Sequence, residues 1–406
     1  MQKTAHLSQL FIFVFILISI LGCQKHVNFP AEIESNFQAK PEYYQLDMEI
    51  EGEIPTEYKV DMTLFEIIDD VTIVHPARIE RRGGFSISFP KHSYEIDLDE
   101  DIPLGNLPDD DDWILNANYI DKTFLRHVMS YQIFRDMHPN NRAPQTKYVE
   151  LSRNHEYYGL FVLMEKVDRS VLEVDKNDEM AVIFKESPIF RPNIDQFIPQ
   201  DSSNFHQQTF PKLEDDDKTE FINDLRAFIV ETTDEVFTSE FTHHFDLANI
   251  IDWHLLILLT NNNDGILKNF YLYKTDSQTP VRIAPWDYDH SFGRGGAGHL
   301  NLIAVQCNPE RSILFKRLME FDWYKTALKN RWGNLQSSNL FTARDIRRRI
   351  REYRVTLDML VERNFEKWPV DGPRYMDDAN FVEEIEIMHT YLDMRFEQLE
   401  EYFEGF

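Results

Sequence analysis

The sequence predicts an α+β fold, with strands in its first half and helices in its last hundred residues. Two early segments, 46–50 and 58–64, alternate apolar and polar residues as half-buried strands do. Near the end, residues 342–345 read Thr-Ala-Arg-Asp, a capping-box pattern, and apolar residues then recur every three or four positions. Of the 406 residues 42% are hydrophobic and 28% are charged, so there is enough apolar material for a packed core.

Acidic residues outnumber basic ones, with 70 Asp and Glu against 42 Lys and Arg, which gives a formal net charge of −28. This charge repels the phosphates of nucleic acids and the headgroups of anionic lipids. We therefore expect no nucleic-acid partner. The sequence does not predict an oligomeric state.

The first 22 residues differ from the rest and predict a signal peptide. Their apolar run at 10–21 is too short to span a bilayer comfortably. The residues Ile-Leu-Gly-Cys at 20–23 resemble a bacterial lipobox, in which the cysteine is lipidated and becomes the mature N-terminus. We therefore expect an exported lipoprotein anchored to the membrane through Cys23, at the periplasmic side or the cell surface. An ordinary secretory signal is the alternative.

The cysteine content agrees with this expectation. Cys23 and Cys307 are the two cysteines of the chain, and lipidation would consume the first, so no disulfide framework is expected. We expect Cys307 to be a buried structural residue.

Strand patterns continue as far as Leu98, with a turn at 81–86 and clean alternation at 94–98. The acidic run at 109–112 predicts a solvated loop, and a role in capping the next helix is a further possibility. That helix is predicted from apolar residues at a spacing close to 3.6, which are Phe124, Val128, Tyr131, Ile133 and Phe134.

Two apolar-rich runs, 147–151 and 158–164, predict a hairpin joined by a polar turn at 152–156. Pro, Ser, Asn, Gln and Asp dominate residues 187–217, which predicts a long surface insertion. A further helix follows, with Phe221, Leu225, Phe228 and Ile229 on one face.

Five arginines lie among the apolar positions of the helix that starts near residue 342. We expect them to pair with acidic residues on a solvated face, and a groove for an anionic substrate is the alternative. These residues are Arg347, Arg348, Arg349, Arg351 and Arg354.

The segment 255–274 is the most informative for function. An apolar run leads into a polar, turn-prone loop with Asp264 and Asn269 five positions apart, and an alternating strand follows. The same interval separates the catalytic-loop Asp and Asn of protein kinases, in which Asp accepts the proton of the substrate hydroxyl and Asn binds metal.

A second strand at 281–284 leads into Pro-Trp-Asp-Tyr-Asp at 285–289. Alternation in a strand would point Asp287 and Asp289 to the same side. Two carboxylates near a third acid form an oxygen-rich pocket suited to Mg²⁺ or Mn²⁺. Each pattern alone is also common in ordinary turns and strand ends.

Taken together, the blocks resemble the spore coat protein H (CotH) kinase family. Six blocks occur in the family's order across roughly residues 58–300. They are Arg82 to Leu98, Trp113 to Arg126, Tyr148 to Glu165, Phe184-Lys185, Asp264 to Asn269, and Pro285 to Asp289. One departure from the family pattern is the turn Asn154-His155-Glu156, which we expect to alter turn geometry more than chemistry.

The resemblance implies an atypical two-lobed protein-kinase-like fold that uses ATP and Mg²⁺ or Mn²⁺ to phosphorylate Ser or Thr hydroxyls of an envelope or secreted protein. It makes Asp264 the catalytic acid and Asp287 the metal-binding Asp. Asn269 would assist the metal, and Asp289 would be a further ligand or would orient other groups.

Four other residues are candidates for contacts with the nucleotide. Lys91 could neutralise phosphates, with a solvated strand lysine as the alternative. Arg82 precedes a glycine turn that could cover phosphates or simply form a hairpin. Arg126 could meet phosphate or pair with a carboxylate. Glu165 is placed where a kinase hinge would meet adenine, although a surface Glu fits the pattern nearly as well.

We accordingly expect a signal peptide (1–22), a tether (23–40), a β-rich N-terminal lobe (41–175), a catalytic C-terminal lobe (176–305) and a helical extension (306–406). Two alternatives stay open for the function. One is a catalytically silent relative that uses the same site for binding or as an envelope scaffold, and the other is a metal-dependent phosphohydrolase.

Overall fold

The computed structural model of the chain describes residues 43–69, 71–193, 207–295, 311–370 and 378–406. The expected signal peptide, lipidation site Cys23 and tether lie outside these residues, as do Cys307 and part of the predicted insertion.

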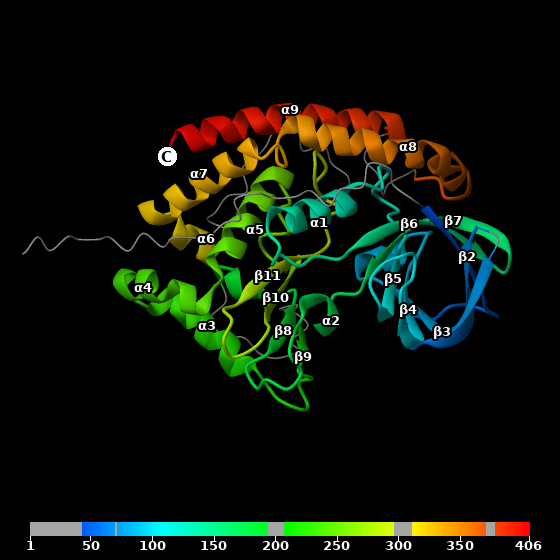
Figure 1. The fold of residues 1–406 in the computed structure, drawn as a ribbon, viewed down its shortest axis with the longest axis horizontal. Coiled ribbons are helices and arrows are strands. Elements are labelled where there is room, and N and C mark those ends of the chain that lie inside the picture. Colours follow the sequence, from blue (N-terminus) through cyan, green and yellow to red (C-terminus); the bar gives the residue numbers. More distant parts are fainter. Residues whose placement is uncertain (1–42, 70, 194–206, 296–310, 371–377) are drawn as a thin grey trace, which may run out of the picture.

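The N-terminal part is a closed barrel of seven strands in the order β1-β2-β3-β4-β5-β7-β6 (Figure 1). Neighbouring strands are antiparallel, except that β1 runs parallel to β6 and so closes the barrel. The predicted strands at 46–50, 58–64 and 94–98 and the predicted hairpin are confirmed. The bounds are β1 Tyr43–Glu49, β2 Val60–Ile68, β3 Val71–Arg82, β4 Ser93–Ile102, β5 Asp110–Asn116, β6 Thr146–Arg153 and β7 Glu156–Glu165.

The barrel interior is filled by every second side chain, because successive residues of a strand face opposite sides. Strand β4 shows this pattern: Tyr94, Ile96 and Leu98 are buried in the barrel core, whereas Glu95 and Asp97 between them point outward and are partly exposed. A short 3₁₀ turn, η1 Phe85–Ser88, links β3 to β4 where a turn was predicted.

The prediction of a solvated loop at 109–112 is wrong, and the run does not cap the next helix either. Asp110 begins β5, which lies between β4 and β7. Asp112 is accommodated there because Lys166 lies 3.1 Å from its carboxylate. The helix predicted after the run does form, as α1 Arg126–Met137, but Leu125 occupies its N-cap position.

The turn between β6 and β7 has two residues in the left-handed region, Asn154 (φ 51°) and His155 (φ 66°). Such a pair matches the twist of a two-residue hairpin. The Asn154 side chain accepts the Ile50 N–H at 2.9 Å, and it donates to the Ile50 carbonyl at 3.1 Å. The turn Asn154-His155-Glu156, which departs from the family pattern, is therefore held by the hydrogen bonds of Asn154 to Ile50, just after β1.

A second sheet, in the order β11-β10-β8-β9, lies beside the barrel and is antiparallel throughout. Its strands are β8 Val182–Lys185, β9 Gln207–Phe210, β10 Phe270–Lys274 and β11 Arg282–Pro285. The α-helices between β7 and β10 are α2 Arg169–Leu172, α3 Thr219–Glu231, α4 Asp234–His244 and α5 Leu247–Thr260, and the predicted helix at 221–229 is α3.

The segment 187–217 is not wholly a surface insertion. Its first part, η2 Pro188–Phe190, is buried, because Phe190 packs against Trp253 and Phe270 in the core. Its later part supplies β9.

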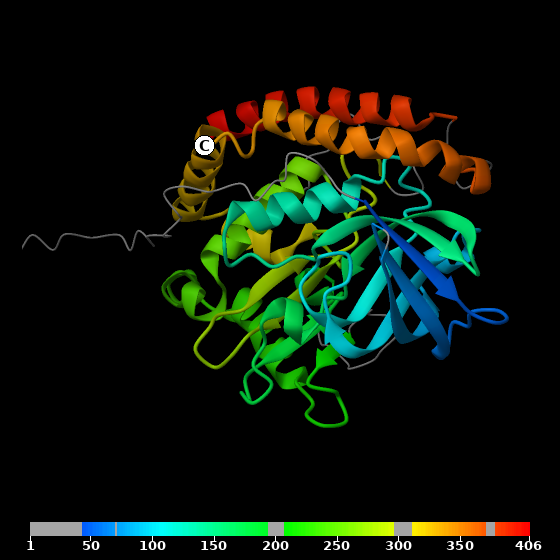
Figure 2. The ribbon, with the colours of Figure 1, turned by 45° about the vertical axis from the view of Figure 1, so that its right-hand side comes forward.

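Four helices complete the described chain, which are α6 Ile313–Leu318, α7 Asp322–Ser337, α8 Ala343–Lys367 and α9 Phe381–Glu404. Figures 1 and 2 show α8 and α9 side by side across the top of the molecule. Helix α8 contacts β7 of the barrel, and α9 contacts α5. Their apolar faces belong to the same core as the second sheet, so the helices after residue 311 are part of one body with it.

The predicted start of α8 is confirmed, since the Thr342 hydroxyl accepts the Asp345 N–H. Four of the five predicted arginines of this helix pair with acids, as expected, although Arg349 is fully buried and does not lie on a solvated face; Arg351 is exposed and is not among these pairs. The pairs are Arg347 with Asp393, Arg348 with Asp345 and Glu352, Arg349 with Asp136 and Asp345, and Arg354 with Asp358. Within the described ranges, no helix is both long and apolar enough to cross a membrane.

Candidate functional site

The residues 286–294 that follow β11 form a loop, here called the DYD loop after Asp287-Tyr288-Asp289. The strand ends at Pro285, so strand alternation does not orient the two aspartates. Asp287 instead adopts the left-handed region, with φ 57°. Such a backbone is uncommon for a non-glycine residue, and surrounding contacts must hold it.

Helix α1 holds this loop from one side through two side chains one turn apart. The Tyr131 hydroxyl oxygen accepts the backbone N–H of Asp287 at 3.0 Å. The Nδ1 atom of His127 accepts the next backbone N–H, that of Tyr288, also at 3.0 Å. Tyr131 was predicted only as part of a buried helix face, and His127 was missed.

Two asparagines hold the loop from the other side. Asn269 donates its side-chain N–H to the carbonyl of Asp287 at 2.9 Å, and Asn262 donates to the same oxygen at 3.3 Å. Asn269 was predicted to assist a metal. Its side chain is 4% exposed, and it binds the backbone of Asp287, the predicted metal ligand. Asn262 was missed, although three consecutive asparagines at 261–263 precede Asp264.

The carboxylates of Asp287 and Asp289 lie together with the His127 ring, and one ligand atom from each falls within 4.8 Å of the others. The Asp287 side chain is about half exposed, at 49%. Burial of its surroundings, and then the negative charge of Asp289, raise the pKa of Asp287 to about 6. This is the signature of a carboxylate whose charge lacks a sufficient counter-charge.

A hard divalent cation fits this donor set. Mg²⁺ prefers oxygen ligands and is commonly held by one or two carboxylates together with phosphate oxygens. The raised pKa of Asp287 indicates that a cation would relieve repulsion between the two carboxylates.

Asp264 lies on the adjoining loop between α5 and β10. Its carbonyl accepts the N–H groups of Leu267, Lys268 and Asn269, which closes a tight turn. Its carboxylate is 41% exposed and lies 3.4 Å from Lys268 Nζ. Among the described residues, it is not a member of the His127, Asp287 and Asp289 group.

The Asn262 side chain connects the backbone at Asp264 directly to the DYD loop. The Asn262 carbonyl oxygen accepts the N–H groups of Asp264 at 3.1 Å and Gly265 at 2.9 Å, while its amide donates to Asp287. The predicted catalytic acid and the predicted metal ligand are therefore both bound through their backbones by the Asn262 amide, and Asn269 adds a second tie between the two loops.

The structure does not bring Lys91 to the group of His127, Asp287 and Asp289. The side chain is 1% exposed, and Nζ donates to the carbonyl oxygens of Ala117, at 2.8 Å, and Leu160. The ammonium also faces the rings of Phe161 and Phe124. Burial lowers the pKa of Lys91 well below its usual value. These contacts indicate a structural role.

Arg126 is likewise fully buried, and it is paired with Asp121 at 2.5 Å and with Glu384 of α9 at 2.9 Å. Its Nε donates to the Ser291 carbonyl in the DYD loop at 2.9 Å. Glu384 also binds Arg294 at the end of this loop. The contacts of Arg126 therefore hold the loop to α1 and α9, and they correspond to the carboxylate-pairing alternative.

Arg82 and Lys185 lie over the Trp286 ring, with the Arg82 guanidinium 5.4 Å and the Lys185 ammonium 5.9 Å from its centroid. Burial lowers the pKa of Lys185, and the nearby charge of Arg82 adds to this effect. Arg82 was predicted as a nucleotide contact. Lys185 was recognised only as part of a sequence block.

Glu165 is at the end of β7, where its carboxylate accepts the Gln145 N–H at 2.6 Å. Burial raises its pKa, and this hydrogen bond opposes the shift. Its side chain is 6% exposed, so it is not an ordinary surface residue.

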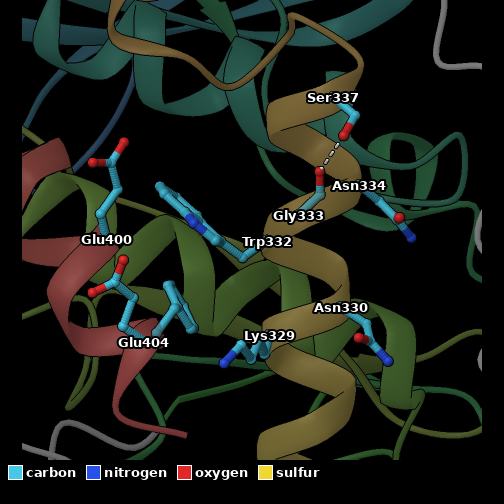
Figure 3. A pocket seen from close by; sticks show the side chains of 9 residues that line it. Lys329, Asn330, Trp332, Gly333, Asn334, Ser337, Glu400 and Glu404 are labelled. Atoms are coloured by element: carbon cyan, nitrogen blue, oxygen red, sulfur yellow. Dashed lines mark hydrogen bonds between the residues drawn. The ribbon is translucent and has the colours of Figure 1, made fainter.

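A hollow of about 740 Å³ lies elsewhere, between α7 and α9 (Figure 3). Its lining includes the apolar rings of Trp332 and Phe403 and the carboxylates of Glu400 and Glu404. It shares no residue with the group around Asp287.

The fold and the site thus define an α+β protein with a paired-carboxylate loop fixed beside a second acidic loop. A model of the CotH kinase protein family matches residues 79–399. The chain belongs to this family, whose members are protein kinases. The matched range contains all of the predicted catalytic, metal and nucleotide residues, from Arg82 to Asp289.

One curated relative is inner spore coat protein H of Bacillus subtilis (strain 168). It is 24% identical to this chain over 217 residues, which are 53% of this chain and 59% of the relative. The similarity thus covers less than two thirds of the relative's length.

Proposed function

We propose that the chain is an atypical protein kinase that transfers the γ-phosphate of ATP to Ser or Thr hydroxyls of an envelope or secreted protein. ATP use is implied by membership of the CotH kinase family. In this proposal the barrel is the N-terminal lobe of a two-lobed kinase-like fold, and the Asp264 and DYD loops belong to the C-terminal lobe.

The observation that carries the proposal is the fixed arrangement of Asp264 and Asp287 through Asn262. Phosphoryl transfer relies mainly on positioning and charge stabilisation, so a rigid link between these two acids is what the reaction needs. The half-exposed Asp264 carboxylate would accept the proton of the substrate hydroxyl. The hydroxyl oxygen would bond to the γ-phosphorus as the bond from this phosphorus to the β–γ bridging oxygen breaks and ADP leaves.

Asp287 and Asp289 would hold Mg²⁺ or Mn²⁺, which would neutralise the charge that develops on the phosphates. Asn269 and Tyr131 would act through the backbone of Asp287, which they hold in its left-handed conformation.

Positive charge for the phosphates would come from Arg82 and Lys185, which lie together beside Trp286. The charge of Asp287 also acts on the ammonium of Lys185, so this lysine is near the proposed metal site. Lys91 and Arg126 are fully enclosed by protein contacts, and we assign them to stability.

We also propose that the chain is an exported lipoprotein anchored through Cys23, because residues 20–23 resemble a lipobox. A Cys23→Ser variant should then leave the membrane fraction or remain unprocessed. Unchanged membrane extraction and unchanged mass would contradict this anchor. Outside the cytoplasm, the kinase would need a local source of ATP.

The decisive experiment incubates the purified chain with labelled ATP, Mg²⁺ or Mn²⁺, and envelope extract. Label in a protein is the expected result, with an Asp264→Asn sample as the matched control. Release of free phosphate without labelled protein would indicate a phosphohydrolase. Binding of ATP without either product would indicate a catalytically silent relative.

A further inference from the structure

His127 has an unusual hydrogen-bond arrangement for a histidine beside two carboxylates. Its ring is 4% exposed, and Nδ1 accepts the Tyr288 N–H at 3.0 Å. The Tyr131 hydroxyl lies 3.4 Å from the same nitrogen. Because this hydroxyl oxygen already accepts the Asp287 N–H, its own proton is available to His127.

These contacts fix which nitrogen of the ring carries the proton. In a neutral imidazole one nitrogen is a donor and the other is an acceptor. A backbone N–H can only donate, so Nδ1 must be the acceptor and the proton must be on Nε2. Rotating the ring by half a turn would place a carbon opposite the Tyr288 N–H and lose this bond.

The consequence concerns the metal. Histidines that bind metals through one nitrogen almost always donate a proton from the other. His127 shows the opposite arrangement, because its Nε2 has a proton where a metal ligand needs a lone pair. The group of His127, Asp287 and Asp289 is therefore not a site with one histidine and two carboxylate ligands, despite its spacing.

The Nε2–H group nevertheless faces the carboxylate site. It lies 3.9 Å from the nearer oxygen of Asp287, which is longer than a hydrogen bond. An anionic oxygen bound beside the carboxylates through a shared cation would lie on this side of the ring. A phosphate oxygen has this chemistry, and hydrogen bonds to charged acceptors are the stronger ones.

We propose that His127 donates its Nε2–H to a phosphate oxygen of the bound nucleotide and does not bind the metal, which is held through oxygen atoms alone. The inference rests on the proposed kinase function, and it assigns His127 as a nucleotide-binding residue.

Two substitutions separate the acceptor role of Nδ1 from the donor role of Nε2 in His127. In His127→Asn the side-chain oxygen takes the place of Nδ1, so the DYD loop keeps its acceptor while the Nε2–H donor is lost. In His127→Gln the amide N–H takes the place of Nε2, so the donor is kept while the acceptor is lost. His243→Gln, on an exposed histidine of α4, is the control.

The experiment measures the affinity of each variant for Mn²⁺ alone and for ATP in Mn²⁺ by calorimetry, together with pulsed electron paramagnetic resonance of Mn²⁺ alone bound to the wild-type chain. We expect His127→Asn to weaken ATP binding about 10- to 100-fold with little change in Mn²⁺ binding. His127→Gln should keep more of the ATP affinity and lower the melting temperature. No histidine nitrogen should couple to Mn²⁺ in the wild type.

Nitrogen coupling in the wild type would overturn the inference whether or not the variants fold. Full ATP affinity in a folded His127→Asn variant would also overturn it, and would leave the kinase proposal intact. Failure of the wild type to bind ATP at all would overturn the kinase proposal, and the inference with it.

Discussion

The hydroxyl oxygen of Tyr131 lies 3.0 Å from the backbone nitrogen of Asp287 and accepts its N–H. This contact joins α1 to the DYD loop at the one aspartate that has a left-handed backbone there. A non-glycine residue in this region costs on the order of 1–3 kcal/mol, so the conformation persists only where surrounding contacts hold it. Tyr131, Asn262 and Asn269 together bind the N–H and the carbonyl of Asp287.

Asp287→Asn should make the protein more stable in the absence of metal, and the gain should depend on pH. Burial and Asp289 raise the pKa of Asp287 from its usual 3.8 to about 6 in the folded state. The folded chain therefore binds this proton more tightly than the unfolded chain, and ionisation of Asp287 costs stability as pH rises. Asparagine also tolerates the left-handed backbone.

The difference in unfolding free energy between Asp287→Asn and wild type, measured in chelator, should be largest above pH 6 and should vanish below about pH 4. Groups that do not interact with Asp287 cancel in this difference. Added Mg²⁺ should raise the melting temperature of the wild type and not of the variant. A variant that is less stable than the wild type at pH 8 in chelator would contradict this explanation.

Local patterns predicted much of the fold. The alternation in β2 and β4 and the capping signal at Thr342 depend on residues close in sequence, and all three elements form. Closure of the barrel by β1 and β6 could not be predicted, because it joins segments about a hundred residues apart. Strand β5 was missed because its aspartates are rare in strands, and the lysine that compensates Asp112 comes much later in the chain.

The residues of the site likewise fall into those that local motifs predicted and those that depend on tertiary packing. Asp264, Asn269, Asp287 and Asp289 stand in short motifs, and the structure places them on two adjoining loops. His127 could not be found from sequence, since its role depends on how α1 packs against a loop 160 residues later. Lys91 and Arg126 looked like phosphate contacts because they are cations within family blocks. Lys91 is instead buried against carbonyls distant in sequence, and Arg126 pairs with the nearby Asp121 and the distant Glu384.

Two lysines should respond differently to substitution by methionine. Lys91→Met leaves the carbonyls of Ala117 and Leu160 without their donor, so we expect a loss of about 1–3 kcal/mol of stability and unchanged ATP affinity. Lys185→Met should fold normally and bind ATP more weakly, because a cation near the Asp287 site is removed. Denaturant unfolding and calorimetry on both variants test this, and weaker ATP binding in a folded Lys91→Met variant would contradict our assignment.

Glu384→Gln should destabilise the protein strongly. This buried carboxylate binds Arg126 and Arg294, which reach it from α1 and from the end of the DYD loop. Removing one member of a buried ion-pair network leaves uncompensated charge and typically costs about 3–5 kcal/mol. The exposed Glu386 on the same helix provides the control Glu386→Gln, which should change stability by less than about 0.5 kcal/mol. Equal unfolding midpoints for the two variants would show that α9 does not hold the loop.

Asp264→Asn and Asp287→Asn should lose activity in different ways. Asp264→Asn keeps the shape of its loop, because the contacts that close the turn and bind Asn262 are made by the backbone. It cannot accept the proton of the substrate hydroxyl, so phosphate transfer should fall by roughly 10²- to 10⁴-fold while ATP still binds. Asp287→Asn removes a charge from the proposed metal site, so ATP affinity in Mg²⁺ and transfer should fall together.

Calorimetry and phosphate incorporation on the same two preparations distinguish these outcomes, with Asp358→Asn of α8 as a control outside the site. Full transfer by Asp264→Asn would contradict its role as proton acceptor. Equal loss of ATP binding in both variants would instead assign Asp264 to the metal, and the Asn262 bridge would then position two metal ligands rather than a base and a ligand.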